Sequence, residues 1–338
     1  MKSFFQSEPA RSTDMGSTPP FTISSKSINL IAEICALLER ASIAEENADR
    51  IRLRKINRMK TIRGTLAIEG NSLSEEQVTA IIDGKHIVAP VKEIQEVRNA
   101  ILTYDRFMDF DPYNPKDLLK AHGIMALGLV DNPGHFRKGG VCVAGKNGIS
   151  HIAPPADRVH FLISDLFDWL KNSDDHILIK SSVFHYEFEF IHPFEDGNGR
   201  MGRLWHSRLL AEWNRVFSYL PVENMILENQ AAYYKAIEQS TDCTDSGIFV
   251  EFMLGVIKKT LEAHNNDTVN DTVNDTVNDT VKLILQLIRE NPYISYDEIA
   301  TKTGKSRVTV SRKISELKKQ GILRRIGADR NGYWEISE

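Results

Sequence analysis

The run of twelve residues from His192 to Arg203 holds the side chains best suited to chemistry. It reads His-Pro-Phe-Glu-Asp-Gly-Asn-Gly-Arg-Met-Gly-Arg. The imidazole of His192 can accept a proton from a hydroxyl near neutral pH. Asp196 offers a hard carboxylate oxygen of the kind that binds Mg²⁺ together with substrate phosphates. The run therefore suits the binding of a polyphosphate and the activation of a hydroxyl.

The glycines of this run favour a phosphate-binding turn. Gly197 and Gly199 flank Asn198, and glycine allows both a positive φ and a close approach of a ligand to the backbone. A helix is expected next, because apolar residues recur at steps of three and four: Met201, Leu204, Trp205, Leu209 and Trp213. The turn then lies at a helix N-terminus, which favours an anion. Arg200 and Arg203 are three residues apart, so both guanidinium groups face similar sides.

Each part of the run has an ordinary explanation when it is taken alone, but their occurrence together within twelve residues is hard to explain by chance. The run resembles the signature of Fic-domain proteins, His-Pro-Phe-x-[Asp/Glu]-Gly-Asn-Gly-Arg-x-x-Arg, at every fixed position. The resemblance implies a mainly α-helical catalytic core that transfers AMP from ATP to a hydroxyl of a target protein. It further implies that His192 is the general base, Asp196 the Mg²⁺ ligand and Arg203 the partner of the γ-phosphate. The α- and β-phosphates would contact the turn itself: Gly197, Asn198, Gly199 and Arg200.

A second motif lies upstream, at the end of an amphipathic helical stretch that starts near residue 44. It reads Thr-Leu-Ala-Ile-Glu-Gly-Asn from Thr65 to Asn71. Gly70 alone would be an ordinary helix stop, although an acidic Glu69 is mildly unfavourable there because of the helix dipole. The segment resembles the inhibitory motif of Fic proteins, [Ser/Thr]-x-x-x-Glu-[Gly/Asn]. The resemblance implies that Glu69 pairs with Arg203 and leaves ATP in a non-productive pose.

Residues 141–153 predict a β-hairpin with an Asn-Gly turn. It is either a plain surface connection or, as the resemblance implies, a flap that docks the target segment by strand addition. The flap residues would be Ile149, Ser150, His151, Ile152 and Ala153.

Residues 229–234 follow the motif helix and resemble the segment that lines the adenine pocket in Fic proteins. That resemblance assigns Asn229 and Tyr233 to the adenine pocket, although a tyrosine pair on a helix is more often part of a core. Residues 185–191 resemble the helix that precedes the motif, with aromatic side chains in the core.

The C-terminal part has a different character. Residues 266–281 repeat Asn-Asp-Thr-Val four times, and these residues have low helix propensity, so we interpret 264–281 as a polar linker. Two alternatives remain open, a tether that binds a partner and a short ordered connection packed on a neighbour. Residues 282–338 carry 12 basic and 7 acidic residues, whereas the rest of the chain is acidic. Their pattern predicts three helices and two strands, including a capping box that starts at Ser295.

This pattern resembles a winged helix-turn-helix domain. DNA contacts would come from the third helix and the strands: Ser306, Arg307, Thr309, Arg312, Lys313, Arg324, Arg325 and Arg330. Two alternatives remain open, a protein-interaction module and a simple spacer.

Length and composition bound the rest. With 338 residues and three cysteines, Cys35, Cys142 and Cys243, the chain suits several domains in a reducing compartment, without a disulfide framework. Without a sustained apolar run, we expect a cytoplasmic protein with no membrane partner. The expected divisions are a flexible N-terminus (1–24), a helical region with the inhibitory motif (25–110), the catalytic core (111–263), the linker (264–281) and the winged helix (282–338).

These observations predict a mainly α protein with a Fic-type helical core, a β-hairpin flap and a small α+β winged-helix domain. The expected activity is that of a protein adenylyltransferase, with Mg²⁺ as cofactor, ATP as co-substrate and a protein bearing a Ser, Thr or Tyr hydroxyl as target. Alternatives are another nucleotide donor, removal of AMP, or a DNA-bound regulator that uses the Fic core as a nucleotide sensor. A homodimer is expected from the resemblance alone.

Overall fold

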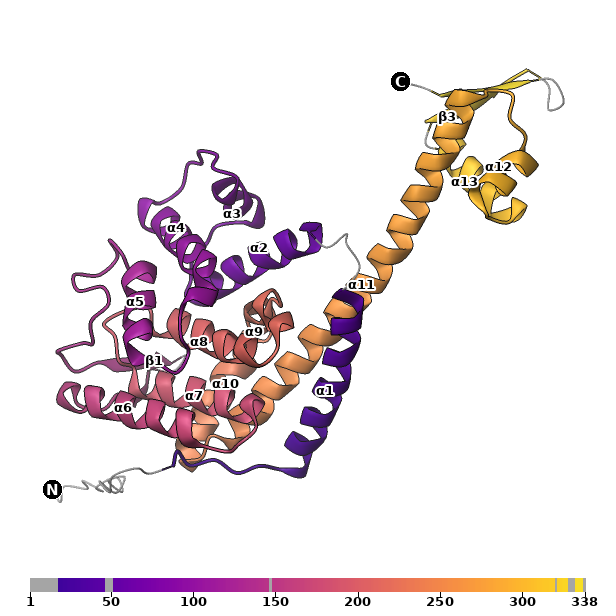
Figure 1. Ribbon diagram of the computed structural model, residues 1–338. Helices are drawn as coiled ribbons and strands as arrows, with labels where there is room; N and C mark the ends of the chain where they lie inside the picture. The colour runs from indigo at the N-terminus through magenta and orange to yellow at the C-terminus, as the bar shows by residue number, and fades with distance from the viewer. Residues whose placement is uncertain (1–17, 46–50, 146–147, 320, 328–331, 337–338) are drawn as a thin grey trace. The chain divides into compact units, whose positions relative to one another are not determined.

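The computed structural model describes residues 18–45, 51–145, 148–319, 321–327 and 332–336, drawn in colour in Figure 1. Most of the N-terminus predicted to be flexible, residues 1–17, lies outside the described residues. The chain divides into two units, residues 1–265 and 266–338. Each unit is described by itself.

The first unit is almost entirely helical, as the sequence predicts. Its elements are α1 (Ser25–Glu45), α2 (Ile51–Ile68), α3 (Glu75–Ile82), α4 (Val91–Asp105), η1 (Phe107–Asp109), α5 (Pro115–Met125), β1 (Cys142–Gly145), β2 (Gly148–Ile152), α6 (Ala156–Asn172), α7 (Ile177–Ile191), α8 (Asn198–Trp213), η2 (Arg215–Ser218), α9 (Val222–Glu228), α10 (Gln230–Cys243) and the first part of α11 (Gly247–Glu290).

Helices α7 and α8 form the centre of this unit. They are joined by residues 192–197, which are called the motif loop below. The side chains of α7 are buried nearly all round, including Tyr186 and Phe188. A helix that is apolar on every side must be enclosed by others. On α8, Leu204 and Trp205 are fully buried. Helix α6 covers α7 with a stripe of buried residues at steps of three and four: Val159, Ile163, Leu166, Phe167 and Leu170.

Helix α2 packs closely on α9. A Cβ atom added at Gly64 would lie 2.7 Å from the backbone nitrogen of Asn224, so only glycine permits this approach. Ile62 and Leu66 are buried on the same helix. The predicted inhibitory segment is therefore the end of a helix that belongs to the core, not a peripheral arm.

The hairpin predicted at residues 141–153 is present. Strands β1 and β2 pair antiparallel, with Cys142 opposite Ile152 and a bulge between Val143 and Ala144. The tip, residues 146–147, lies outside the described residues.

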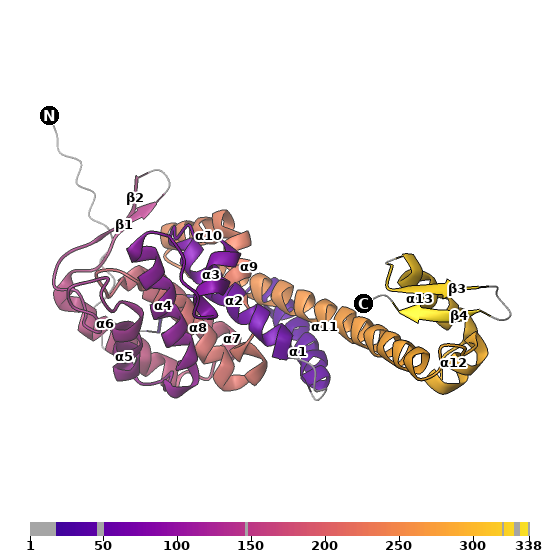
Figure 2. The same ribbon diagram turned by 90° about the horizontal axis from the view of Figure 1, so that it is seen from above.

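Helix α11 continues through the Asn-Asp-Thr-Val repeat. Its first part runs beside α1, where Lys258 Nζ lies 2.6 Å from Glu33 Oε2 (Figures 1 and 2). The backbone of the repeat is thus helical although its residues have low helix propensity. Its role as a linker stays a prediction.

The second unit contains the end of α11, then α12 (Tyr296–Thr303), α13 (Arg307–Lys319), β3 (Leu323–Ile326) and β4 (Tyr333–Ile336). The predicted capping box is present, because the Ser295 hydroxyl accepts from the Glu298 amide while the Glu298 carboxylate accepts from the Ser295 amide. Strands β3 and β4 pair antiparallel. Trp334 closes a small core with residues of all three helices, and its Nε1 donates to Ile294 O at 3.1 Å. Three helices and a hairpin agree with the winged-helix prediction.

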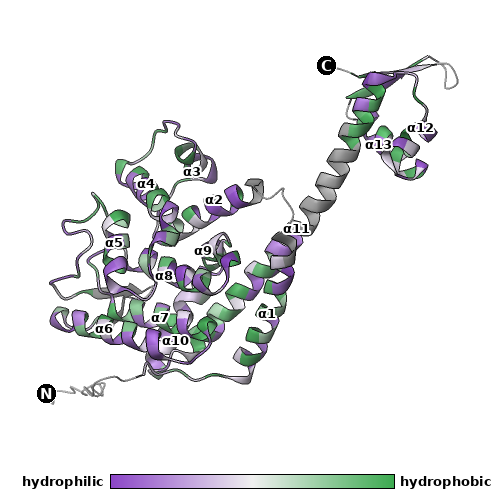
Figure 3. Ribbon diagram, viewed as in Figure 1, coloured by the Kyte–Doolittle hydropathy of each residue, from purple (hydrophilic) through white to green (hydrophobic). Residues whose placement is uncertain are grey.

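Figure 3 shows hydrophobic and hydrophilic stretches mixed along helices such as α1 and α6. None of the helices that the structure describes combines the length and hydropathy needed to cross a bilayer.

Candidate active site

The motif loop between α7 and α8 is held in one shape by its own backbone and by Asn198. His192 ends α7 in the left-handed region, with φ 50°, and Gly197 precedes α8 with φ 86°. The Asn198 amide closes the loop, because its Oδ1 accepts from Phe194 N at 2.8 Å and its Nδ2 donates to Phe194 O at 2.9 Å. Since this side chain is fully engaged, a phosphate contact by Asn198 would come from its backbone N–H.

The half-buried His192 is itself the first of the two left-handed residues of this loop, and Gly197 is the second. The Nδ1 of His192 is 3.4 Å from Glu189 O. A left-handed residue is a frequent way to end a helix, although it is usually glycine and rarely histidine. The left-handed backbone of His192 turns the chain out of α7 and into the loop that leads to α8.

His122 of α5 contacts the motif loop at Phe194 and Asp196. The sequence did not predict this residue as part of the site. Its ring stacks on Phe194 with centroids 3.7 Å apart. Gly134 N donates to its Nδ1 at 2.9 Å, so Nε2 carries the proton and donates to Asp196 O at 3.0 Å. Burial lowers the pKa of His122 to about 4, which keeps the ring neutral and this tautomer fixed.

Arg137 is the second support that sequence reasoning missed. It is buried, and its guanidinium donates to four carbonyl oxygens: His192 at 2.7 Å, Ile191 at 3.2 Å, Pro154 at 2.6 Å and Gly139 at 2.8 Å. The same side chain thus ties the end of the hairpin to the end of α7. Its contacts join residues up to 55 positions apart, and no local pattern announces them.

Arg200 provides buried positive charge at the first turn of α8. Its Nη2 lies 3.2 Å from Asp196 Oδ1. Its Nε and Nη1 are buried without a hydrogen-bond partner among the described residues, although buried guanidinium donors normally have one. The first N–H groups of a helix also lack intrahelical acceptors. Together these donors form a site that suits an anion.

Asp196 is half-exposed, and its Oδ1 also accepts from Gly197 N at 2.6 Å. Among the described residues, no group of three or more His, Cys, Asp or Glu side chains could hold a metal ion. A single half-exposed carboxylate is the kind of protein ligand that Mg²⁺ takes when phosphate oxygens and water complete its coordination.

Arg203 and Glu69 lie together. Arg203 Nη2 is 2.7 Å from Glu69 Oε1 and also donates to Thr65 O at 3.0 Å, while its Nε donates to Thr65 Oγ1 at 3.2 Å. Burial alone would lower the pKa of the Arg203 guanidinium, but the neighbouring Glu69 carboxylate raises it. Arg203 therefore remains charged although only 1% of it is exposed.

The Glu69 carboxylate also occupies space over the glycine turn. A Cβ atom added at Gly199 would lie 2.1 Å from Glu69 Oε1. Oε1 thus lies directly against the first turn of α8, where the sequence predicts the phosphates. A side chain at position 199 would therefore have to displace the Glu69 carboxylate.

The two residues assigned to an adenine pocket lie at the start of α10. Asn229 caps this helix, and its Nδ2 donates to Met225 O at 2.9 Å. Tyr233 is 1% exposed, and its hydroxyl lies 3.1 Å from Nε2 of the buried His185. Burial lowers the pKa of His185 to about 3. The adenine assignment remains a prediction.

The flap residues lie on β2 and directly after it. Ala153 is buried and donates its N–H to Val141 O at 3.2 Å. Ile152 is 75% exposed. The side chains of residues 149–151 lie outside the described ones.

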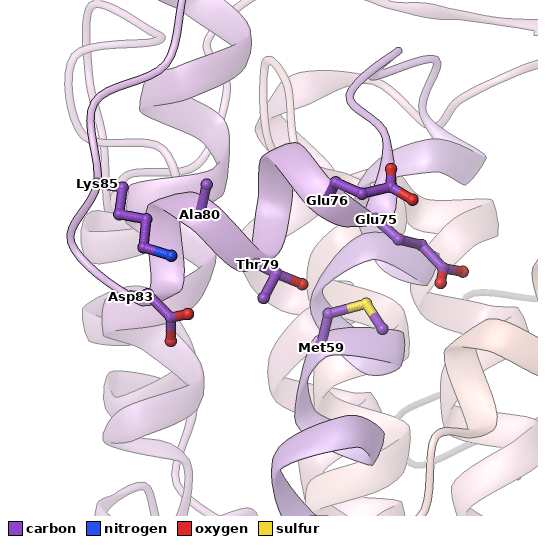
Figure 4. A pocket seen from close by; sticks show the side chains of 7 residues that line it. All are labelled: Met59, Glu75, Glu76, Thr79, Ala80, Asp83 and Lys85. Atoms are coloured by element: carbon purple, nitrogen blue, oxygen red, sulfur yellow. The ribbon is translucent and has the colours of Figure 1, made fainter. Parts of the chain in front are cut away.

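A cavity of about 380 Å³ lies away from the motif, between α2 and α3 (Figure 4). Glu75 and Asp83 line it, but Arg63 lies 3.4 Å from Glu75 and Lys55 lies 2.8 Å from Asp83. These acids are neutralised locally, and the cavity contributes no residue to the motif site.

The basic residues predicted to bind DNA occupy several environments in the second unit. Ser306, Arg307 and Arg312 are exposed. The prediction that Lys313 lies on the exposed face of the third helix was wrong: it is buried, with Nζ 2.6 Å from Glu316 Oε2, because position 313 is three residues after Val310 and four before Leu317, which are both buried.

The remaining predicted contacts lie in or near the hairpin, apart from Thr309. Thr309 is half-buried and its hydroxyl lies 2.9 Å from that of Ser306. Arg324 forms an ion pair with Glu335, and Arg325 lies 4.7 Å from the Trp334 ring centroid. Arg330 lies outside the described residues.

Comparison with known proteins matches both units. Residues 112–210 match the Fic/DOC family model, and residues 277–324 match a winged helix-turn-helix DNA-binding model. The crystal structure of a Fic family protein from Desulfovibrio desulfuricans G20 is 40% identical, with a TM-score of 0.75 over 95% of this chain and 98% of that one. The chain belongs to the Fic family.

Curated Fic relatives cover less of the chain. Protein adenylyltransferase Fic of Aedes aegypti is 29% identical over 240 residues, which are 66% of this chain and 45% of that protein. The Culex quinquefasciatus protein of the same name is 32% identical over 217 residues, 59% of this chain and 40% of that protein. The chain thus spans less than half the length of these Fic relatives.

Proposed function

We propose that this Fic protein is a protein adenylyltransferase that transfers AMP from ATP to a hydroxyl group of a target protein. One observation carries the proposal: the loop that begins with His192 leads directly into a helix N-terminus whose first turns hold two buried arginines, one of them with N–H donors that have no hydrogen-bond partner among the described residues. A base and an anion-binding turn on one loop are what the attack of a hydroxyl on a phosphoanhydride requires. The names of the relatives from Aedes aegypti and Culex quinquefasciatus support the same activity.

The reaction follows from these positions. The α8 N-terminus and Arg200 bind the phosphates, and Arg203 binds the γ-phosphate once it is free. The flap aligns a segment of the target by strand addition, using residues 149–153. His192 takes the hydroxyl proton, the oxygen forms a bond to the α-phosphorus, and the bond to the β-phosphate oxygen breaks. Pyrophosphate leaves, and the protonated His192 releases its proton to solvent.

Asp196, with the phosphates, would hold Mg²⁺, whose chemistry is to neutralise the charge on the phosphate oxygens. Asp196 is well placed for this because Gly197 N and Arg200 fix its carboxylate. The adenine is placed by α10, through Asn229 and Tyr233.

Glu69 restrains the activity, because its carboxylate takes both the guanidinium of Arg203 and the space over Gly199. We expect Glu69→Gly to raise AMP transfer by about 10- to 100-fold, since a charge-assisted hydrogen bond contributes about 1.5–3 kcal/mol. We expect His192→Ala to abolish transfer. The measurement is intact mass and α-labelled ATP incorporation after incubation with Mg²⁺-ATP and cell lysate.

Glu69→Gly/His192→Ala is the control, because it restores the arginine but lacks the base. Equal labelling by wild type and Glu69→Gly contradicts the inhibitory role. If no protein is labelled while ATP binds and stays intact, adenylyl transfer is the wrong activity. A competition series with other nucleotides then tests another donor, and loss of label from a modified target tests removal of AMP.

A second candidate function, DNA binding by residues 282–338, rests on the match to a winged helix-turn-helix DNA-binding model. The exposed Arg307 and Arg312 on α13 suit contact with the duplex. We expect duplex affinity to fall steeply with added salt, because phosphate contacts release counterions. Absence of binding at low salt would favour a protein-interaction role for this unit.

A further inference from the structure

The end of α2, which directly precedes Glu69, forms hydrogen bonds with a second helix, α10. The last four carbonyl groups of a helix lack intrahelical donors. In α2, the first of these four carbonyls is Thr65 O, which accepts from Arg203. The carbonyls of Leu66 and Ala67 accept from backbone amides of the turn that follows. The last, Ile68 O, accepts from two side chains of α10: Gln230 Nε2 at 2.9 Å and Tyr234 Oη at 3.4 Å.

The rest of α2 has little freedom to move. Gly64 packs against the backbone of Asn224, and Ile62 and Leu66 are buried in the core. Withdrawal of the whole helix would break this packing. Movement of the end of the helix alone would break fewer contacts, chiefly those of Ile68, which is 4% exposed, because Gly70 follows with φ 90° and the Glu69 side chain is 38% exposed.

We propose that Gln230 and Tyr234 are positioning residues that hold the last turn of α2 and thereby hold the Glu69 carboxylate on Arg203. This inference rests on the proposed inhibitory role of Glu69. When both donors are lost, Ile68 O has no protein partner, and the turn that carries Glu69 can unwind while Leu66 stays in the core. Release of inhibition then needs one helical turn to move, and α10 controls that turn.

The test uses the full chain with Gln230→Ala/Tyr234→Phe, in the wild-type and in the Glu69→Gly background. In the wild-type background we expect AMP transfer to rise about tenfold, since two hydrogen bonds that restrain Glu69 are removed. In the Glu69→Gly background we expect no further rise, because there is no carboxylate left to position. Gln239→Ala is the matched control: it removes an exposed glutamine of the same helix.

Hydrogen–deuterium exchange of residues 66–71 gives a readout that needs no activity. We expect faster exchange there in the double variant and wild-type exchange in Gln239→Ala. Tyr234→Phe alone, which removes only a hydroxyl, gives a smaller change in the same direction and is used if the double variant unfolds. Unchanged exchange overturns the proposal, and so does an equal rise in transfer in both backgrounds. If Glu69→Gly itself gives no transfer, the proposed function fails, and exchange alone decides whether α10 holds the turn.

Discussion

The arginines of the motif site and those of the C-terminal unit lie in opposite environments. In the first unit, Arg137, Arg200 and Arg203 are at most 3% exposed. In the C-terminal unit, the side chains of Arg307 and Arg324 are each 67% exposed, and each pairs with an acid on the surface, Asp297 and Glu335 respectively.

The difference follows from desolvation. A buried guanidinium must have fixed partners, so its loss leaves several groups unpaired at once. An exposed ion pair contributes little, because water and salt compete with it. Such a pair can give up its acid for a phosphate at small cost. Substitution of the three buried arginines should therefore be severe, and substitution of Arg307 or Arg324 should be mild.

The largest effect is expected at Arg137. Arg137→Ala removes donors from four carbonyl oxygens, including those of His192 and Pro154, so the motif loop and the hairpin lose their common support. We expect the free energy of unfolding to fall by about 3 kcal/mol or more. Urea denaturation measures this change.

Arg324→Ala is the matched control, and we expect it to cost no more than about 0.5 kcal/mol. Similar losses in the two variants would remove the distinction between the units. Arg137→Lys should fall between them, since one ammonium group cannot serve all four carbonyls.

A smaller effect is expected from pH. The folded-state pKa values of His122 and His185 are about 4 and about 3, below the ordinary value of 6.5, because both rings are buried. Below pH 6.5 these two histidines therefore bind protons in the unfolded chain but not in the folded chain. Their contribution to the free energy of unfolding is constant above pH 6.5. As the pH drops toward 4, the free energy of unfolding falls by roughly 1 kcal/mol per pH unit for each histidine.

This prediction separates the units, because all ten histidines lie before residue 282. Hydrogen–deuterium exchange at pH 7 and pH 5, corrected for intrinsic rates, should show loss of protection in peptides of the first unit alone. His122→Gln, which cannot take up the proton, should reduce the slope. Equal loss in both units would mean that carboxylates dominate.

The sequence predicts the turn and the helix start of the motif loop well because its residues are contiguous. Residues 192–203 form one turn and the start of one helix. Side chains that are close along the chain are therefore also close in the folded protein. The capping box at Ser295 and the hairpin at residues 141–153 are local in the same sense, and both are present. The pair of Glu69 and Arg203 is remote in sequence, and only the resemblance to a family pointed to it.

The residues that support the loop could not be predicted. His122 and Arg137 act through backbone groups 55 to 74 positions away, and backbone partners leave no trace in side-chain patterns. Lys313 was misplaced although its spacing of three residues from Val310 and four from Leu317 puts it on the buried side of α13. The repeat after residue 265 was interpreted as a polar linker because of its low helix propensity, and its backbone is helical.

The smallest effects are expected in the C-terminal unit, and there they should appear in binding rather than in stability. Arg307→Ala and Arg324→Ala should each lower duplex affinity about 3- to 10-fold at low salt and reduce the salt slope by about 1. Arg58→Ala is the matched control, because Arg58 is an exposed arginine of the first unit and pairs with Asp105. A titration over several salt concentrations measures both quantities. If Arg58→Ala weakens binding as much as Arg324→Ala, the duplex does not distinguish the units, and the exposed arginines of the C-terminal unit have no special role in holding it.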